Sequence, residues 1–421
     1  MPAGGSLTTR QESANAEAVQ RLTGADPVLV DVRPLVEAVP TFDRSTVLTS
    51  GAPLAWEEYS GGQRNGILGG AIYEGLAADV EEAEAKLAAG EIRVRSCGDY
   101  GCAGSLVGIY TASMPVLVVE NRTRSNRAYC NLFEGVSRHR LNYGVYNDDV
   151  GRNLRFLHDV VGPVLGEAVR LAGGIPLMPI MKRALHMGDE LHSRNTAATL
   201  LFTREIVEPL MDMQMRLPKE VKQTLDYMRS SDYFFLRLSM AASRAAADGA
   251  HGIAGSSMVT GMVFNCRDFA IRVSGLGDRW FRGPHQTMFG AKLFDGFTEA
   301  DVEIMGGEST FNETAGLGGF AQASAFPLQE YQGGSAQRMV ETNLQMYEIT
   351  LAEHPELKIP YLAFRGVPSG IEIHRVVATG ITPIMDIGVA GKAGGQIGAG
   401  SFRAPLECFQ LAVDAYAETY R

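Results

Sequence analysis

The segment HMGDELHSRNTAAT, residues 186–199, is dense in side chains that could take part in chemistry. It combines two histidines, two carboxylates, an arginine, an asparagine and three hydroxyls. A zinc site on a helix needs histidines three or four residues apart, so that both rings project from one face. His186 and His192 are six residues apart, which places them about 120° apart around a helix. This spacing argues against a metal site.

Two interpretations of this segment remain. In the first it is the polar start of a helix, with Asp189 as a cap and Glu190 paired with Arg194. In the second, donors at a helix N-terminus hold a carboxylate or a phosphate, because arginine binds such groups bidentately and backbone N–H groups and the helix dipole add to the attraction. These donors are His192, Ser193, Arg194, Asn195 and Thr196.

The second interpretation gives members of this cluster a role in a reaction. We predict His192 as the acid or base, Arg194 as an anion clamp and Asn195 as the contact to an amide or carbonyl group. Asp189 and Glu190 are predicted to contact the substrate.

Forty-eight glycines, gathered in short clusters, suggest turns where the backbone approaches a ligand or another backbone closely. In VSGLGDRWFRGP, residues 273–284, the alternatives are a structural turn and a substrate contact through Gly275, Asp278 and Arg279. ETAGLGGFAQA, residues 313–323, resembles a glycine loop leading into a helix, whose N–H groups would cradle an oxyanion or phosphate. Its candidate contacts are Glu313, Thr314, Gly316, Gly318 and Gly319.

Two further glycine-rich segments supply possible donors. FRGVPSG contributes Arg365, and GKAGGQIGAGSFRAP contributes Lys392, Gln396 and Arg403 unless it is a flexible surface loop. The loop at residues 313–323 has neither the lysine-containing ending of a Walker motif nor the spacing of a dinucleotide fingerprint. We therefore expect no ATP or NAD, and we predict no cofactor.

Composition limits the partners and the compartment. Thirty-eight lysines and arginines against 48 aspartates and glutamates give a net charge of −10 without a basic block, so nucleic acid and anionic membranes are poor partners. The chain has no apolar run of the length of a signal peptide or membrane span, and we expect a cytoplasmic protein. Five scattered cysteines indicate reduced thiols. Cys97 and Cys102 have no histidine base nearby and are expected to be buried.

The chain of 421 residues predicts several domains of mixed α/β or α+β class. We expect an N-terminal α/β domain (1–150), with a helix at 12–22, strands at 28–32 and 115–119 and a helix at 74–89. A helical domain (151–231) follows, lying between or inserted into the α/β domains. A glycine-rich C-terminal α/β domain (232–421) completes the chain, with helices near 335–351 and 404–420.

Seven segments, in order along nearly the whole chain, resemble blocks of the AllG-type bacterial family. They are NRAYCNLFEG, MGDELHSRNTAAT, GSSMVTG, IRVSGLGDRWF, ETAGLGGFA, FRGVPSGIE and GQIGAGSFRAPLECF. The family includes a subunit of oxamate carbamoyltransferase from anaerobic allantoin breakdown, part of ureide and nitrogen metabolism. The resemblance implies companion subunits, one of them similar to succinyl-CoA synthetases. It also implies a multidomain α/β fold. The implied reaction is phosphorolysis of oxalurate to carbamoyl phosphate and oxamate.

One departure from the family pattern concerns the block after Cys97. Consecutive histidines follow the cysteine in the family pattern, whereas this chain has Gly98, Asp99 and Tyr100. If those histidines carry protons in relatives, Asp99 or Tyr100 could replace them here, or the substrate could differ.

The residues and the resemblance together predict a carbamoyltransferase-type enzyme subunit that acts on a small anionic ureide with phosphate. Carbamoyl transfer needs anion clamps and donors to a developing oxyanion, which arginines and glycine-loop amides can supply. Two alternatives stay open: a hydrolase of a cyclic or linear ureide or amide, and a non-catalytic scaffold subunit. We expect a homo-oligomer that also binds companion subunits.

Overall fold

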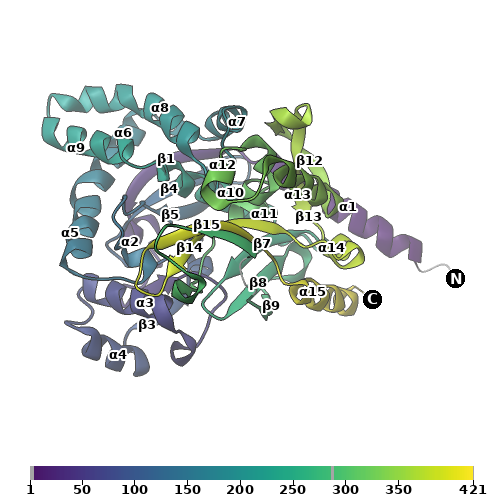
Figure 1. Ribbon diagram of the computed structural model, residues 1–421, viewed down its shortest axis with the longest axis horizontal. Coiled ribbons are helices and arrows are strands. Elements are labelled where there is room, and N and C mark those ends of the chain that lie inside the picture. The colour runs from purple at the N-terminus through teal and green to yellow at the C-terminus, as the bar shows by residue number, and fades with distance from the viewer. Residues whose placement is uncertain (1–3, 286–288, 421) are drawn as a thin grey trace.

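The computed structural model describes residues 4–285 and 289–420 (Figure 1). The N-terminal half is organised on an antiparallel sheet in the order β5-β4-β1-β6. Its strands are β1 (Pro27–Pro34), β4 (Pro115–Asn121), β5 (Asn126–Asn131) and β6 (Ile175–Pro176). The apolar run predicted as a strand is β4, which is buried because α6 (Gly162–Leu171) packs on β1 and α10 (Phe234–Gly249) packs on β4 and β5.

The remaining N-terminal elements flank this sheet. The helix predicted at 12–22 is confirmed as part of α1 (Gly4–Thr23), whereas the helix predicted at 74–89 is wrong at its start. Helix α3 (Gly61–Tyr73) ends there, and α4 (Val80–Ala88) begins only after a turn, with Asp79 as its N-cap. A short parallel pair, β2 (Thr46–Thr49) with β3 (Arg93–Ser96), and α2 (Leu35–Ala38) complete this part.

The segment predicted to be helical is helical in the structure. It contains α5 (Asp148–Phe156), a π-helical turn (Leu157–Val161), α6, α7 (Met178–His186), α8 (Thr196–Gln214) and α9 (Pro218–Arg229). Helices α6, α8 and α9 contact one another and lie at one end of the molecule (Figure 1). Helix α10 differs from these, because nearly all of its residues are buried.

The C-terminal half combines three antiparallel sheets. One has the order β7-β8-β9, with β7 (Val259–Phe264), β8 (Asp268–Val273) and β9 (Phe281–Pro284). A second has the order β10-β15-β14-β11, with β10 (Phe289–Leu293), β11 (Val302–Glu303), β14 (Ile384–Gly391) and β15 (Gln396–Arg403). The third pairs β12 (Thr350–Ile359) with β13 (Arg365–Ile371).

The helices of this half include both that the sequence predicts. They are α11 (Phe311–Thr314), α12 (Leu328–Gln332), α13 (Ala336–Glu348), α14 (Ile373–Thr379) and α15 (Leu406–Thr419). The segment 391–405 was expected to be a loop, and this is wrong: most of it is strand β15, and the turn to β14 is short. Its glycines permit close strand packing, because a Cβ on Gly398 or Gly400 would collide with the backbone of β10.

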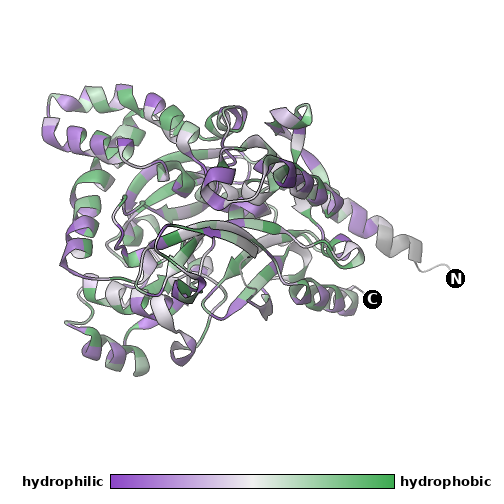
Figure 2. Cartoon of the chain, viewed as in Figure 1, coloured by the Kyte–Doolittle hydropathy of each residue, from purple (hydrophilic) through white to green (hydrophobic). Residues whose placement is uncertain are grey.

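The mixed α/β class is confirmed, with several small sheets that are mainly antiparallel. Apolar residues concentrate between the layers, whereas peripheral helices are more polar outside (Figure 2). The largest buried cluster joins residues from all three predicted domains, among them Leu29, Phe202 and Phe311, and the domain boundaries stay a prediction. Among the described residues, none of the helices has the length and apolar composition that a bilayer crossing requires.

Candidate functional site

The segment rich in polar side chains forms the loop between α7 and α8. Helix α7 ends at His186, which is exposed, and α8 begins only at Thr196 with Asn195 as its N-cap. The predicted helix start is therefore confirmed. Asp189 acts as a cap from a distance, because its Oδ2 accepts the N–H of Ala198 at 2.8 Å.

This loop is curled around the buried carboxylate of Glu190. Leu191 adopts a left-handed φ of +71°, so that the next three N–H groups turn back toward Glu190. Its oxygens accept from His192 at 3.2 Å, from Ser193, and from Arg194 at 2.8 Å. These amides are therefore not available to an external anion, and the expected side-chain pair of Glu190 with Arg194 is wrong.

Arg194 and Asn195 hold the loop in place. The Arg194 Nε donates to the Gly188 carbonyl at 3.0 Å and lies 3.5 Å from Asp189 Oδ1. The Asn195 Nδ2 donates to the carbonyl of His192 at 2.7 Å. Both side chains thus support the position of His192.

His192 pairs with a carboxylate that is distant in sequence. Its Nδ1 lies 2.7 Å from Oε1 of Glu313, on α11, and both side chains are buried. Burial alone would lower the pKa of His192, but the charge of Glu313 and its hydrogen bond outweigh burial, and the pKa is raised. Because Nδ1 is engaged, Nε2 is the ring nitrogen left for a ligand.

The glycine turn at residues 316–319 packs directly on this pair. Gly318 has a φ of +56°, and a Cβ there would collide with the Glu313 carboxylate, so the close approach requires glycine. The Gly318 N–H donates to the Glu190 carbonyl at 2.8 Å, and the Gly319 N–H donates to Glu313 Oε1 at 3.0 Å. The N–H groups of Gly316 and Leu317 also have backbone partners. The turn therefore binds protein oxygens, which corrects the prediction of an oxyanion cradle.

A second buried acid, Asp386 on β14, contacts the Glu313 carboxylate through its backbone N–H. Its N–H donates to Glu313 Oε1 at 3.1 Å, while its Oδ1 accepts from the amides of Gln322 at 2.5 Å and Gln332 at 3.3 Å. Burial raises the pKa of Asp386 to about 7, and the negative charge of Glu313 adds to the effect. Burial likewise raises the pKa of Asp189 to about 6.

We expect an Asp386→Asn variant to be more stable than the wild type at pH 8 and to lose that advantage toward pH 4. The folded pKa of about 7 exceeds the unfolded value, so the stabilisation from the bound proton is complete below about pH 4 and is lost as the pH rises through 7. The gain at pH 8 should be about 4 kcal/mol in the free energy of unfolding, because each unit of pKa difference corresponds to about 1.4 kcal/mol. Denaturant unfolding of both proteins between pH 4 and pH 8 measures it, and a constant difference across this range would contradict the assignment.

A small pocket opens beside His192. It encloses about 40 Å³, and since one water needs about 10–15 Å³ on this scale, it has room for a small ligand group. Its polar lining residues are Ser105, Arg140, Tyr143, His192, Ser193, Tyr233, Arg237, Ser309 and Gln396.

Two buried arginines dominate the charge of this pocket. Arg140 and Arg237 are 8% and 4% exposed, and among the described residues neither forms an ion pair and neither Nε has a hydrogen-bond partner. Both lie over the ring of Phe133, whose centroid is 5.2 Å from the Arg140 guanidinium and 5.8 Å from that of Arg237. Buried positive charges that form no ion pair favour an anionic ligand.

Tyr143, Tyr233 and Gln396 form a neutral wall of the pocket, where the Tyr143 ring lies 4.5 Å from the Arg140 guanidinium. The Tyr143 hydroxyl lies 3.4 Å from Oε1 of Gln396, and the Gln396 amide donates to the hydroxyl of Tyr331. Tyr331 in turn bonds to Tyr233. The Gln396 Nε2 also donates to the Gly398 carbonyl at 3.0 Å. The group of this amide left for a ligand is therefore Oε1, which can accept from the N–H of an amide or ureide.

The remaining predicted contacts lie outside this pocket. Gly275, Asp278 and Arg279 lie at the turn between β8 and β9, where Asp278 and Arg279 are exposed. Asp278 lies 3.4 Å from His251, and Arg279 lies over the ring of Phe281. The segment is a turn in the structure, and Arg279 does not line the pocket at His192.

Other predicted residues have local partners. Thr314 donates to the Thr310 carbonyl at 3.1 Å, and Arg365 is exposed and pairs with Glu353. The Lys392 Nζ donates to the Ala300 carbonyl at 2.8 Å and lines a wider cavity of about 360 Å³, which shares Tyr143 with the pocket.

The segment that departs from the family pattern also lies apart from the pocket. Asp99 is exposed, and Tyr100 packs edge-on against Phe42. Neither Asp99 nor Tyr100 lines the pocket. The expected burial of Cys97 and Cys102 is confirmed, and both are free thiols.

Sequence reasoning missed Arg140 and Arg237 as site residues. Arg140 directly follows the exposed residues 136–139, so its neighbours in sequence give no sign that it is buried. Arg237 lies in FFLRLSMAA, a stretch of α10 that is otherwise apolar apart from one serine. A single charge in such a helix is the signal that could have identified it, because arginine is rarely buried without a reason.

The similarity of this protein to known proteins extends over nearly the whole chain. Residues 92–309 match the family described as "Oxamate carbamoyltransferase subunit AllG". The protein of that name from Escherichia coli (strain K12) is 38% identical over 418 residues, covering 98% of this chain and 99% of its own.

Two further relatives have no stated function. The uncharacterized protein YahG of the same organism is also 38% identical, over 416 residues covering 98% of this chain and 88% of its own. A crystal structure of a conserved protein of unknown function from Enterococcus faecalis V583 has a TM-score of 0.95 at 33% identity, covering 99% of both chains.

The chain therefore belongs to the AllG family of oxamate carbamoyltransferase subunits.

Proposed function

We propose that the protein is a carbamoyltransferase subunit that transfers the carbamoyl group of a small anionic ureide, of the oxalurate type, to phosphate. The observation that carries the proposal is the pocket where two buried arginines, without ion-pair partners among the described residues, meet the His192–Glu313 pair. Family membership supports the same reaction class, because the E. coli relative is named as a subunit of oxamate carbamoyltransferase.

The arginines and the neutral wall would bind opposite ends of the substrate. Arg140 and Arg237 hold the carboxylate and stabilise negative charge as it grows on the attacked carbonyl oxygen. Gln396 and Tyr143 contact the amide end. Holding both ends aligns the carbamoyl carbon for attack.

His192 would move the proton that the reaction requires. An oxygen of hydrogen phosphate attacks the ureido carbonyl carbon, the bond from that carbon to the oxamate nitrogen breaks, and carbamoyl phosphate forms. The leaving nitrogen takes a proton from His192, and the proton released by hydrogen phosphate restores the imidazolium. The charge of Glu313 raises the pKa of His192 and so favours its protonated form. Asp189, Glu190, Arg194 and Asn195 serve to hold the loop.

The name of the relative implies other subunits. We propose that a companion similar to succinyl-CoA synthetases completes the enzyme and that the chain self-associates. This chain supplies the residues that line the pocket at His192 described above.

The decisive assay mixes oxalurate with the chain assembled with its companion subunits, with and without inorganic phosphate. We expect carbamoyl phosphate and oxamate in equal amounts, and no oxamate when phosphate is omitted. Oxamate formed at the same rate without phosphate would identify a hydrolase. No turnover by the assembly, together with normal complex formation, would identify a scaffold.

A further inference from the structure

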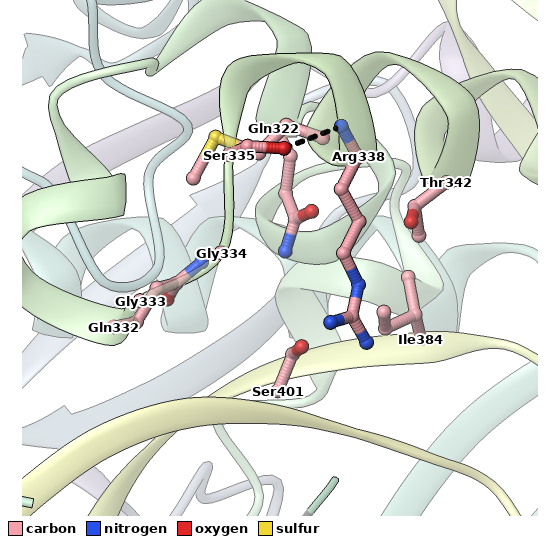
Figure 3. Close-up of a pocket in the computed structure, with 10 residues that line it drawn as sticks. Gln322, Gln332, Gly333, Gly334, Ser335, Arg338, Thr342, Ile384 and Ser401 are labelled. Atoms are coloured by element: carbon pink, nitrogen blue, oxygen red, sulfur yellow. Dashed lines mark hydrogen bonds between the residues drawn. The ribbon is translucent and has the colours of Figure 1, made fainter. Parts of the chain in front are cut away.

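Helix α8 carries an apolar stripe on its exposed side. Leu200 near its start and Met215 at its C-cap are 65% and 92% exposed, and Val207 and Met211 between them are also exposed. At about 100° per residue these four side chains lie within about 80° of one another around the helix and form one face, which we call the α8 stripe. None of the four lines the pocket at His192 or the cavity between α13 and β15 (Figure 3).

The other sides of α8 are packed against the protein. The helix contacts α6, α7, α9 and α10, and Phe202, Ile206 and Leu210 are buried. Because α6, α8 and α9 lie at one end of the molecule, another protein can reach the exposed side (Figure 1). Soluble proteins rarely leave a contiguous apolar face in water, so the α8 stripe indicates an interaction surface.

Three charged side chains lie within or beside the α8 stripe. Arg204 falls inside its sector, whereas Glu208 and Asp212 follow at one edge. All three are exposed, and among the described residues none of them forms an ion pair, while the next arginine, Arg216, is already paired with Glu167. Glu208 and Asp212 are four residues apart on the helix, so their like charges repel, and a cation from another chain would relieve the repulsion.

Two copies of α8 fit each other when they pack antiparallel. In a symmetric dimer each residue of the helix faces the residue that lies equally far on the other side of the two-fold axis. An axis between Val207 and Glu208 therefore places Leu200 of one copy opposite Met215 of the other. The apolar ends of the α8 stripe then cover each other twice, and the two Val207 side chains lie next to the axis.

The same register places opposite charges together. Arg204 lies opposite Met211 of the second copy and one residue from its Asp212, which is about 1.5 Å along the helix axis. Glu208 of the second copy lies less than one helical turn from Arg204. The two-fold axis repeats this contact, so the dimer has two Arg204–Asp212 pairs, whereas separated copies leave these charges unpaired. This complementarity of the surface with itself favours a second copy over a different protein.

We infer, resting on the self-association proposed above, that the α8 stripe binds the α8 stripe of a second copy in this antiparallel register. The contact involves one helix from each copy and is smaller than the about 800 Å² per partner of a standard interface. The dimer therefore dissociates readily, with a Kd in the micromolar range. Its formation does not require the reaction proposed at His192, because none of the stripe residues lines that pocket.

Sedimentation velocity of the full-length chain between about 1 and 100 µM tests this surface. We expect the wild-type protein to pass from monomer to dimer over this range. Arg204→Asp should weaken the dimer about tenfold or more, because the new carboxylate faces Asp212 at two symmetric places. Asp212→Arg should weaken it to a similar extent, because two arginines then face each other at both places.

The sharpest test mixes these two variants. In a dimer of one Arg204→Asp copy with one Asp212→Arg copy, each carboxylate again faces an arginine. We expect the equimolar mixture to form dimers at concentrations where each variant alone is monomeric. A structural defect in either variant could not produce this recovery, which requires that the two positions meet on different copies.

A further variant removes apolar contact without changing the charge. Met211→Gln should weaken the dimer about tenfold, because the two-fold axis repeats the loss of apolar burial. Met187→Gln is its matched control. Met187 directly follows α7 and is 53% exposed, like Met211 at 52%, but it does not belong to the α8 stripe. Its substitution should leave the dimer unchanged.

Three results would each overturn the inference: wild-type protein that stays monomeric at about 100 µM, a dimer unaffected by Arg204→Asp and Met211→Gln, or a mixture that stays monomeric. Variants that remain dimeric but lose a companion subunit would also overturn it and would assign the α8 stripe to that subunit. Sedimentation does not depend on turnover, so a failed assay of carbamoyl transfer leaves these results standing.

Discussion

An Arg237→Met variant is expected to bind the anionic substrate about 10- to 100-fold more weakly while its fold stays intact. Arg237 is buried in the pocket and its Nε has no partner among the described residues, and a hydrogen bond to a charged group contributes about 1.5–3 kcal/mol. Methionine has a similar length and no charge, so it also removes the desolvation cost of the guanidinium. Steady-state kinetics of the assembled enzyme should show the increase in KM, and thermal unfolding should show an equal or higher Tm.

Arg279→Met is the matched control for this experiment. Arg279 is an arginine that the sequence favours as an anion clamp, yet it is exposed at the turn between β8 and β9. Its substitution should leave KM unchanged. An increase in KM for Arg279→Met together with an unchanged KM for Arg237→Met would show that the pocket at His192 is not the substrate site.

A Glu313→Gln variant should lower turnover about tenfold at neutral pH and shift the pH profile toward acid. Glutamine keeps an oxygen for the N–H groups of Gly319 and Asp386 but removes the charge that raises the pKa of His192. Burial then dominates and the histidine pKa falls, so less imidazolium is present at pH 7. A general acid typically contributes 10²- to 10⁴-fold to the rate. The dependence of kcat on pH measures both effects.

The neighbouring acid limits the size of this shift. Asp386 also faces His192, and its own pKa falls when the charge of Glu313 is removed, so part of the negative charge returns. We therefore expect a partial shift of the profile toward acid and not a complete loss of the titration. A His192→Gln variant should abolish the titration altogether. A Glu313→Gln profile that coincides with the wild-type profile would exclude His192 as the proton carrier.

Local sequence patterns were sufficient for much of the secondary structure. The continuous apolar run of β4 and the helical periodicity of α13 and α15 are properties of neighbouring residues, and each element is found where the pattern indicates it. Strand β15 was missed because its glycines look like a loop. Their reason lies outside the strand, in the close approach of β10.

The candidate site was predictable only in part, because its contacts are distant along the chain. His192 and Glu313 were both identified as polar residues of interest, but nothing in either segment indicates that they pair across 121 positions. The prediction for the glycine turn is wrong for the same reason. Its amides bind Glu190 and Glu313 in place of a ligand, and the turn's own sequence does not indicate these partners. Arg140 and Arg237 can be recognised as a pair only in the folded chain, where both guanidinium groups lie over the ring of Phe133.

The carboxylate of Glu190 has a consequence for how fast a ligand is captured. Because it already binds three successive amides of its own loop, the segment that carries His192 keeps its shape whether or not anything occupies the pocket. Association then loses little conformational entropy from the protein, and encounter can lead to the complex without a slow rearrangement. Selectivity must therefore come from the fit of the ligand to a preformed pocket and not from closure of the loop around the ligand.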